Sequence, residues 1–224
     1  MKPRPATEDD WRAKSVELLA ELKVCGLEVA SPFATELSHY CQLLWTWNEK
    51  LNLTRHTDFE RFASRDVMDS VQLAAFLADG EEILDVGTGG GVPGVVLAII
   101  RPDLDVALCE SVAKKAKAID EIVGRLGLQV PVYHARAEDL LEDLRFDTLV
   151  ARAVGPLWKL GKWFGPHRAM FRRVLAIKGP SWMEERAEAR HRGTLQGFEL
   201  RREAAYPMPG TDSESVILSL SPKT

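Results

Sequence analysis

The pattern of apolar and polar positions divides the chain into a helical first part and a second part in which strands alternate with helices. Three segments carry apolar residues at helical spacing and predict helices, namely residues 11–25, 32–47 and 64–78. Ser31 is expected to cap the second helix, because Pro32 follows it at a position that suits the first helical turn. Residues 1–80 are therefore expected to form a helical N-terminal segment that packs on the core.

The pattern changes at Ile83, where short apolar runs typical of strands begin. These runs are residues 82–86, 105–110, 131–135 and 146–152, with helical segments such as 112–127 between them. Such alternation predicts a parallel sheet with helices on both faces. Two last strand-like runs, 198–207 and 214–221, are joined by little more than a Pro-Gly turn, so they must be antiparallel neighbours. The sheet is expected to occupy residues 81–224 as one α/β domain.

Composition narrows the class of protein without identifying it. Hydrophobic residues make up 46% and charged residues 28% of the chain, which is ordinary for a globular protein. The longest nearly apolar run, residues 92–100, is too short to span a bilayer, so we expect a soluble, cytoplasmic protein without a membrane partner. Nothing in the sequence suggests an obligate dimer, and a monomer is expected. Cys25, Cys41 and Cys109 lack C-x-x-C spacing, so neither a zinc site nor a disulfide framework is expected.

A glycine-rich loop, "LDVGTGGGVPG" at residues 84–94, is the strongest ligand signal in the sequence. It follows a predicted strand and precedes a predicted helix, so a ligand would meet backbone N–H groups at a helix N-terminus. Gly89, Gly91 and Gly94 match the G-x-G-x-x-G pattern of dinucleotide-binding proteins, although a single match is weak evidence. Asp85 would repel a pyrophosphate and attract a cationic amine or sulfonium, which favours S-adenosylmethionine. A nucleotide-dependent oxidoreductase stays one alternative. The other is a tight turn between strand and helix that binds no ligand.

Two further positions suggest where a nucleoside would lie. Glu110 ends the second predicted strand about twenty residues after the loop, where an acid that binds ribose is expected. An exposed acid at the start of a helix is the alternative explanation for it. Ala137 and Glu138 follow the third predicted strand, where a backbone N–H and a polar side chain could meet an adenine edge.

Four motifs together resemble those of the small-subunit ribosomal RNA methyltransferase G family, also called glucose-inhibited division protein B. They are "LLWTWNEKLNLT" (43–54), "DVGTGGGVPG" (85–94), "ARA" (151–153) and "IKG" (177–179). The resemblance covers about residues 35–220. It implies a class I methyltransferase fold, with a seven-stranded, mostly parallel sheet and an antiparallel C-terminal hairpin. It also implies methyl transfer from S-adenosylmethionine to N(7) of a guanine in 16S ribosomal RNA of the small ribosomal subunit.

The resemblance also implies roles for particular residues. Gly87 and Val92 would line the methionine region, residues 110–112 the ribose, and Ala137 and Glu138 the adenine. Arg152 would lie at the mouth that cofactor and substrate share. The full predicted cofactor set is Asp85, Gly87, Gly89, Gly91, Val92, Glu110, Ser111, Val112, Ala137, Glu138 and Arg152.

The chain departs from the family pattern at one position. Members usually have histidine at the start of an H-x-x-D-S segment, and here Asp66 stands in its place. No catalytic function is assigned to Asp66. Asp69 and Ser70 fit the pattern and are read as residues that brace the helix against the loop.

Residues 148–183 contain seven cations and no acidic residue, although the net charge of the chain is −4. The cations are Arg152, Lys159, Lys162, Arg168, Arg172, Arg173 and Lys178. Phosphates could meet these cations while Trp158 and Trp163 stack on unpaired bases, whereas Phe164 and Phe171 are expected in the core. Arg152 and Lys178 are the predicted catalytic residues, because each follows a strand beside the cofactor and could hold a phosphate or the guanine O(6).

The expected chemistry needs no general base, because N(7) of guanine carries a lone pair and no proton. The five histidines show no grouping typical of a metal site or a catalytic triad, and no metal is expected. Catalysis would come from aligning the nitrogen with the methyl–sulfonium bond. Methyl transfer to another acceptor, and an RNA-binding or ribosome-assembly protein without turnover, stay as alternatives.

Overall fold

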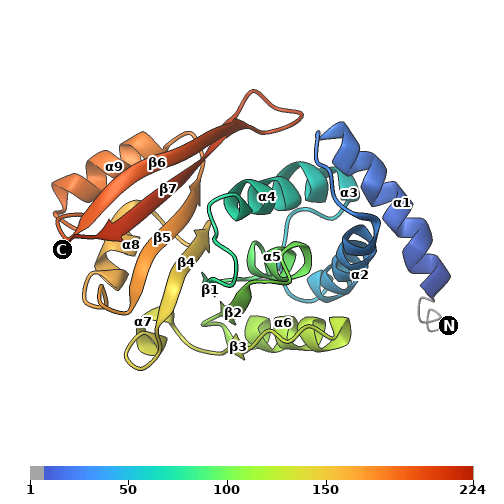
Figure 1. Cartoon of the computed structure of the whole chain (residues 1–224), viewed down its shortest axis with the longest axis horizontal. Coiled ribbons are helices and arrows are strands. Elements are labelled where there is room, and N and C mark those ends of the chain that lie inside the picture. The colour runs from blue at the N-terminus through green and yellow to red at the C-terminus, as the bar shows by residue number, and fades with distance from the viewer. Residues whose placement is uncertain (1–7, 224) are drawn as a thin grey trace.

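Seven strands form one mixed sheet in the order β3-β2-β1-β4-β5-β7-β6 (Figure 1). The computed structural model describes residues 8–223, with side chains from residue 13 onward. The strands are β1 (Glu82–Val86), β2 (Asp105–Cys109), β3 (Val132–Tyr133), β4 (Phe146–Arg152), β5 (Phe171–Lys178), β6 (Phe198–Pro207) and β7 (Glu214–Pro222). The first five run parallel, and β7 pairs antiparallel with both β5 and β6. This is the predicted α/β architecture with its antiparallel hairpin.

Helices cover both faces of the sheet. One face carries α1 (Glu8–Val24), α2 (Ser31–Asn48), α3 (Phe59–Arg61), the π-helix η1 (Phe62–Val67), α4 (Met68–Ala74), α5 (Gly94–Ile100) and α6 (Ala113–Leu126). The other carries α7 (Ala137–Leu140), α8 (Leu157–Phe164) and α9 (Trp182–His191). Successive strand residues alternate between the two cores, as Ile83 and Leu84 do in β1.

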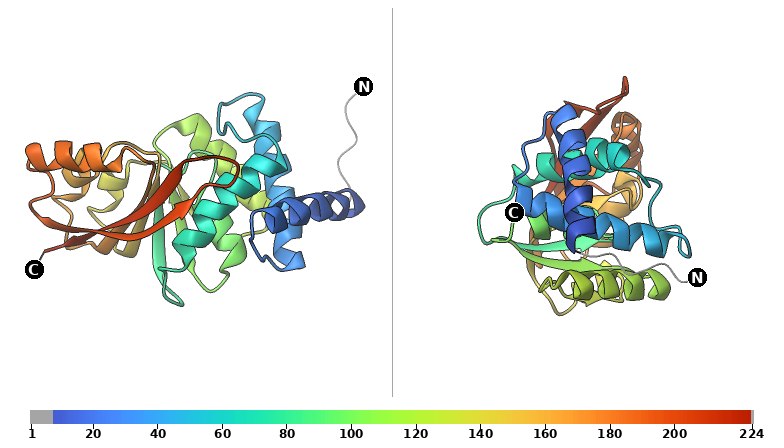
Figure 2. Two further views of the ribbon diagram at one scale, coloured as in Figure 1. Left: turned by 90° about the horizontal axis from the view of Figure 1, so that it is seen from above. Right: turned by 90° about the vertical axis from the view of Figure 1, so that its right-hand side faces the viewer.

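The helices before β1 share an apolar core with the helices after it. Leu18 of α1 and Leu44 of α2 belong to the same buried cluster as Leu97 of α5 and Ile119 of α6. Figure 2 shows α1 and α2 at one end of the sheet, with α4 beside the hairpin of β6 and β7. The core thus continues across residue 80, and the division of the chain there stays a prediction. No helix within residues 8–223 is long and apolar enough to cross a bilayer.

Two local predictions in the helical part need correction. Ala30, whose backbone is extended, precedes the first turn of α2, so Ser31 already lies inside the helix and does not cap it. The helix predicted for residues 64–78 begins instead at Phe59, where the Asp58 side chain accepts a hydrogen bond from the Arg61 N–H at 2.7 Å. The chain then widens into the π-helix η1 before α4, and π-helical turns often mark functional sites.

Candidate functional site

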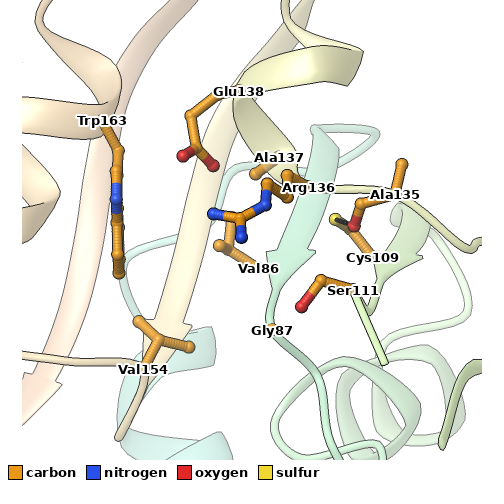
Figure 3. A pocket seen from close by; sticks show the side chains of 10 residues that line it. All are labelled: Val86, Gly87, Cys109, Ser111, Ala135, Arg136, Ala137, Glu138, Val154 and Trp163. Carbon is orange, nitrogen blue, oxygen red and sulfur yellow. Dashed lines mark hydrogen bonds between the residues drawn. The ribbon is translucent and has the colours of Figure 1, made fainter. Parts of the chain in front are cut away.

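Two cavities lie at the carboxyl ends of the parallel strands, where open α/β sheets bind ligands. Cavity A has a volume of about 240 Å³ and is lined by Val86, Gly87, Cys109, Ser111, Ala135, Arg136, Ala137, Glu138, Val154 and Trp163 (Figure 3). Cavity B has a volume of about 220 Å³ and is lined by Leu44, Leu53, Thr54, Gly87, Thr88, Gly89, Gly90, Val92, Arg152 and Ala153. Gly87 lines both, so the glycine loop separates two parts of one elongated site.

The glycine loop presents bare backbone to both cavities. Gly87 has a φ of +63°, and a Cβ atom there would lie only 2.6 Å from the Val154 side chain. Gly89 also has a positive φ and lines cavity B. Gly91 differs, because its missing Cβ would meet Ile119, Val95 and Tyr40 behind the loop. The absence of a side chain at Gly91 thus allows close packing, and its contact with a cofactor stays a prediction.

Asp85 lies behind the loop and lines neither cavity. Its side chain is buried, and Oδ2 accepts hydrogen bonds from the Thr88 hydroxyl at 2.6 Å and the Gly94 N–H at 2.9 Å. The amide expected to meet a ligand at the start of α5 is thus bound to Asp85. Burial raises the pKa of Asp85 to about 6, although these two hydrogen bonds oppose the shift. The residue holds the loop in shape, and its contact with a cofactor amine stays a prediction.

The raised pKa of Asp85 predicts a pH-dependent stability that Asp85→Asn should remove. Because the folded pKa is about 6 and the ordinary value is 3.8, neutral Asp85 stabilises the fold at low pH, and this contribution is lost as the pH rises through 6. The unfolding free energy of the variant minus that of wild type should therefore rise by up to about 3 kcal/mol as the pH increases from about 4 to 7. Denaturant unfolding without cofactor measures it, and a difference that stays constant with pH would contradict the assignment.

Glu110 clamps the loop instead of lining a cavity. Its carboxylate accepts hydrogen bonds from the Gly89 N–H at 3.1 Å and the Val112 N–H at 2.8 Å, and its side chain is buried. The neighbouring Ser111 lines cavity A, whereas Val112 is exposed and lines neither cavity. A ribose contact by Glu110 stays a prediction. The geometry shows a carboxylate that fixes the spacing between the loop and the end of β2.

Cavity A brings together the residues predicted for the adenine region and others that were not predicted there. Ala137 and Glu138 line it as expected, and Arg136 reaches into the same space beside Glu138 (Figure 3). Trp163 of α8 stands on the opposite side from Arg136, so its indole can cover a flat ligand. The sequence predicts Trp163 on an RNA-binding surface, whereas in the structure it lines cavity A. Nothing in the sequence near Arg136 marks it as a lining residue.

Arg152 lies within a buried network of charged groups. Its guanidinium donates to Asp66 Oδ1 at 2.5 Å and to Asp69 Oδ2 at 3.1 Å. Nδ1 of His56 lies 2.9 Å from Asp66 Oδ1, and the Tyr206 hydroxyl donates to Asp69 Oδ1 at 2.7 Å. Burial lowers the pKa of Arg152, but the two carboxylates outweigh it and raise the pKa above its ordinary value. The guanidinium is therefore a fixed cation at the edge of cavity B, and it is not free to follow an RNA backbone.

The network gives Asp66 a structural role. This carboxylate is fully buried, bridges Arg152 and His56, and keeps its Oδ2 without a hydrogen-bond partner among residues 8–223. Sequence patterns assign no role to Asp66, because its partners lie ten and 86 positions away. Asp69 ties α4 to Arg152 of β4 and to Tyr206 of β6, and in the described part of the chain no hydrogen bond to the glycine loop accompanies the bracing role predicted for it. Burial raises its pKa, and the contacts with Arg152 and Tyr206 counteract that shift.

Lys178 lines a third cavity beside cavity B. Cavity C has a volume of about 360 Å³ and is lined by Asp69, Arg152, Ala153, Gly155, Ile177, Lys178, Gly179, Glu185 and Ser215. The Lys178 ammonium donates to the Gly155 carbonyl and to Glu185 Oε2, the latter at 2.8 Å. Ala153 lies where cavities B and C meet and has a φ of +58°, which is rare for a residue other than glycine and typical of functional sites.

Folding neutralises most of the basic window at residues 148–183. Carboxylates from outside the window pair with four of its seven cations, namely Arg152, Arg172, Arg173 and Lys178. Phe164 and Phe171 lie in the core, as predicted. Trp158 is covered by the Arg192 guanidinium, 4.3 Å from its ring centroid. This window therefore offers far less free positive charge than its sequence suggests.

Comparisons with known proteins agree with this arrangement. The family model for GidB, rRNA small subunit methyltransferase G, matches residues 34–206. Ribosomal RNA small subunit methyltransferase G of Rhodopirellula baltica is 55% identical over 86% of this chain and 83% of its own, and the protein of that name from Chromobacterium violaceum is 36% identical over 92% and 97%.

Solved structures show the same fold at low sequence identity. A mutant of MtNAS in complex with S-adenosylmethionine matches with a TM-score of 0.57 at 16% identity, over 96% of this chain and 89% of its own. M. capricolum TrmK in complex with S-adenosylhomocysteine matches with a TM-score of 0.54 at 13% identity, over 69% and 68%. With the family model and the curated relatives covering most of the sequence, the chain belongs to the rRNA small subunit methyltransferase G family.

Proposed function

We propose that the protein transfers a methyl group from S-adenosylmethionine to N(7) of a guanine in 16S ribosomal RNA of the small ribosomal subunit. Family membership supports the reaction, and the joined cavities A, B and C support it physically. The observation that carries the proposal is the position of Gly87, whose bare backbone lies between cavities A and B. A long ligand with a flat end and a polar end fits such a divided site.

The residues present fit this cofactor. Trp163, Glu138 and Ser111 would hold the adenosine in cavity A, while the backbone of the glycine loop and Thr54 would hold the methionine part in cavity B. When bound, S-adenosylmethionine supplies a methyl group activated by a sulfonium. The backbone of Gly87 lines both cavities, so a bound cofactor would lie against it where the two halves meet.

Cavity C is the place for the guanine. It meets cavity B at Arg152 and Ala153, so a base held there would direct a ring nitrogen toward the cofactor. Arg152 and Lys178 line cavity C and are fixed by carboxylates, so they suit the guanine O(6) better than a mobile phosphate. N(7) needs no base, and methylation makes the ring cationic. Asp69 and Glu185, which also line this cavity, would stabilise that charge.

The choice between a methyl donor and a dinucleotide does not depend on Asp85, which lies behind the loop. Family membership supports the methyl donor instead.

Exchanging the two tryptophans of α8 tests the position of the cofactor. Trp163→Ala should weaken S-adenosylmethionine binding about tenfold, since a stacked aromatic contributes roughly 0.5–1.5 kcal/mol beyond its buried area. Trp158→Ala is the matched control, because Trp158 contacts Arg192 and does not line cavity A. Isothermal titration calorimetry measures both affinities. Equal loss in the two variants would contradict a cofactor stacked on Trp163.

Methyl transfer itself is tested with radiolabelled S-adenosylmethionine and small ribosomal subunits from cells that lack this enzyme, followed by mapping of the modified base. We expect label at N(7) of one guanine. Tight cofactor binding without label on RNA would indicate another acceptor or a protein without turnover.

A further inference from the structure

A fourth cavity, outside the cofactor and guanine sites, concentrates arginine side chains. Cavity D has a volume of about 340 Å³ and lies between residues 55–65 and the turn of the β6–β7 hairpin. Arg55, Arg61 and Arg65 line it together with Ser64 and Thr211. The hairpin turn thus closes over α3 and η1 to form a small basic hollow.

The positive charge of cavity D is largely unneutralised. Glu60 is the carboxylate in its lining, against three arginines. Arg61 approaches Asp58 at 3.7 Å in a pair exposed to solvent, and such pairs contribute little. The guanidinium groups of Arg55 and Arg65 make no hydrogen bond or ion pair with the part of the chain that the structure describes. Guanidinium groups left free in a concave surface are suited to bind an anion.

Cavity D therefore differs from the basic window at residues 148–183. There, carboxylates from other segments hold Arg152, Arg173 and Lys178 in pairs that are at least partly buried. The pair that Arg172 forms is instead exposed on the arginine side. In cavity D the fold brings three arginines together and leaves them open to solvent. Free positive charge is expected on a surface that binds RNA, and it is found in cavity D more than in the basic window at residues 148–183.

The chain connects cavity D directly to the reaction site. Leu53 and Thr54 line cavity B, and the next two residues, Arg55 and His56, line cavity D. On η1, Arg65 lines cavity D while its neighbour Asp66 holds Arg152 at cavity B. The same two segments of chain thus line cavity D and hold groups at cavity B, so an anion in cavity D would lie close to the reaction site.

We propose that cavity D binds a backbone phosphate of the RNA next to the guanine in cavity C. The inference rests on the proposed function and specifies how the substrate is held. A guanidinium offers two parallel N–H donors that match a phosphate, and Ser64 and Thr211 add hydroxyl groups. The contact positions the RNA and takes no part in the reaction.

The test compares wild type with the triple variant Arg55→Ala, Arg61→Ala, Arg65→Ala on unmodified small ribosomal subunits. We expect the KM for subunits to rise about 10- to 100-fold, with kcat at saturation and the affinity for S-adenosylmethionine nearly unchanged. The slope of log KM against log salt, measured between about 50 and 200 mM, should fall by roughly 0.7 for each phosphate that the variant no longer neutralises. The corresponding Arg→Lys variant keeps the charges and should keep most of the salt slope.

Arg190→Ala is the matched control, because Arg190 is an exposed arginine on α9, at the other end of the sheet from α3 (Figure 1). It should leave KM and salt slope as in wild type. A wild-type KM and salt slope in the triple variant would overturn the inference, and so would an equal effect of Arg190→Ala. If the triple variant does not fold, Arg65→Ala alone should raise KM about three- to tenfold. Absence of methylation by wild type would instead refute the proposed function.

Discussion

Replacing Arg152 with alanine is expected to lower the free energy of unfolding by about 3–5 kcal/mol. The guanidinium lies between two buried carboxylates, Asp66 at 2.5 Å and Asp69 at 3.1 Å, and its removal leaves both without their cation. Thermal unfolding should shift downward by roughly 10 °C for a chain of this size. Methyl transfer should fall as well, because Arg152 lines both cavity B and cavity C.

A second set of variants separates the structural part of this loss from the catalytic part. Arg152→Ala combined with Asp66→Asn and Asp69→Asn removes the uncompensated charges, so stability should recover while methylation stays low. If Arg152→Ala unfolds at the wild-type temperature, the ion pairs contribute little. In that case the view from sequence alone, of an arginine that mainly contacts RNA, would be the better one.

Gly94→Ala is expected to destabilise the protein by at least about 3 kcal/mol, at the upper end of the range for overpacking. An added Cβ would lie 2.3 Å from Leu108 and 2.7 Å from Asp85 Oδ2, both buried, and the Gly94 N–H is itself bound to that oxygen. The same clash would displace the loop that separates cavities A and B. Affinity for S-adenosylmethionine should therefore fall together with stability, as calorimetry and denaturant unfolding would measure.

Gly124→Ala provides the matched control in α6. Gly124 is also a helical glycine, but a Cβ there would meet nothing within 4 Å. The alanine should stabilise the protein by about 0.5–1 kcal/mol and leave cofactor binding unchanged. Equal destabilisation by the two alanines would show that the contacts at Gly94 are not responsible.

The fold was predictable because it depends on local patterns. The run at residues 198–207 matches β6 residue for residue, and 146–152 matches β4. β6 ends at Pro207, and β4 ends at Arg152, before Ala153 with its positive φ. The π-helix at Phe62–Val67 was missed, because its wider turns have no distinct apolar period and depend on tertiary contacts.

The site was predictable only where it follows the chain. The glycine loop and the carboxyl ends of the strands predicted where cavities A and B lie, because open α/β sheets bind ligands at such loops and strand ends. The ion pairs of Arg152 could not be predicted in this way, because Asp66 and Asp69 lie 86 and 83 positions before it. For the same reason the basic window was overrated, as a run without acids says nothing about carboxylates that other segments supply.

The bond from Tyr206 to Asp69 has a consequence for how the protein is made. The network joins His56, Asp66 and Asp69 from the helical first part with Arg152 of β4 and Tyr206 of the hairpin, which is synthesised last. During translation Asp66 and Asp69 are synthesised long before Arg152, and Tyr206, which bonds to Asp69, is synthesised later still. Ser215 of the hairpin also lines cavity C, beside Asp69 and Arg152, so this cavity is complete only when the hairpin has left the ribosome.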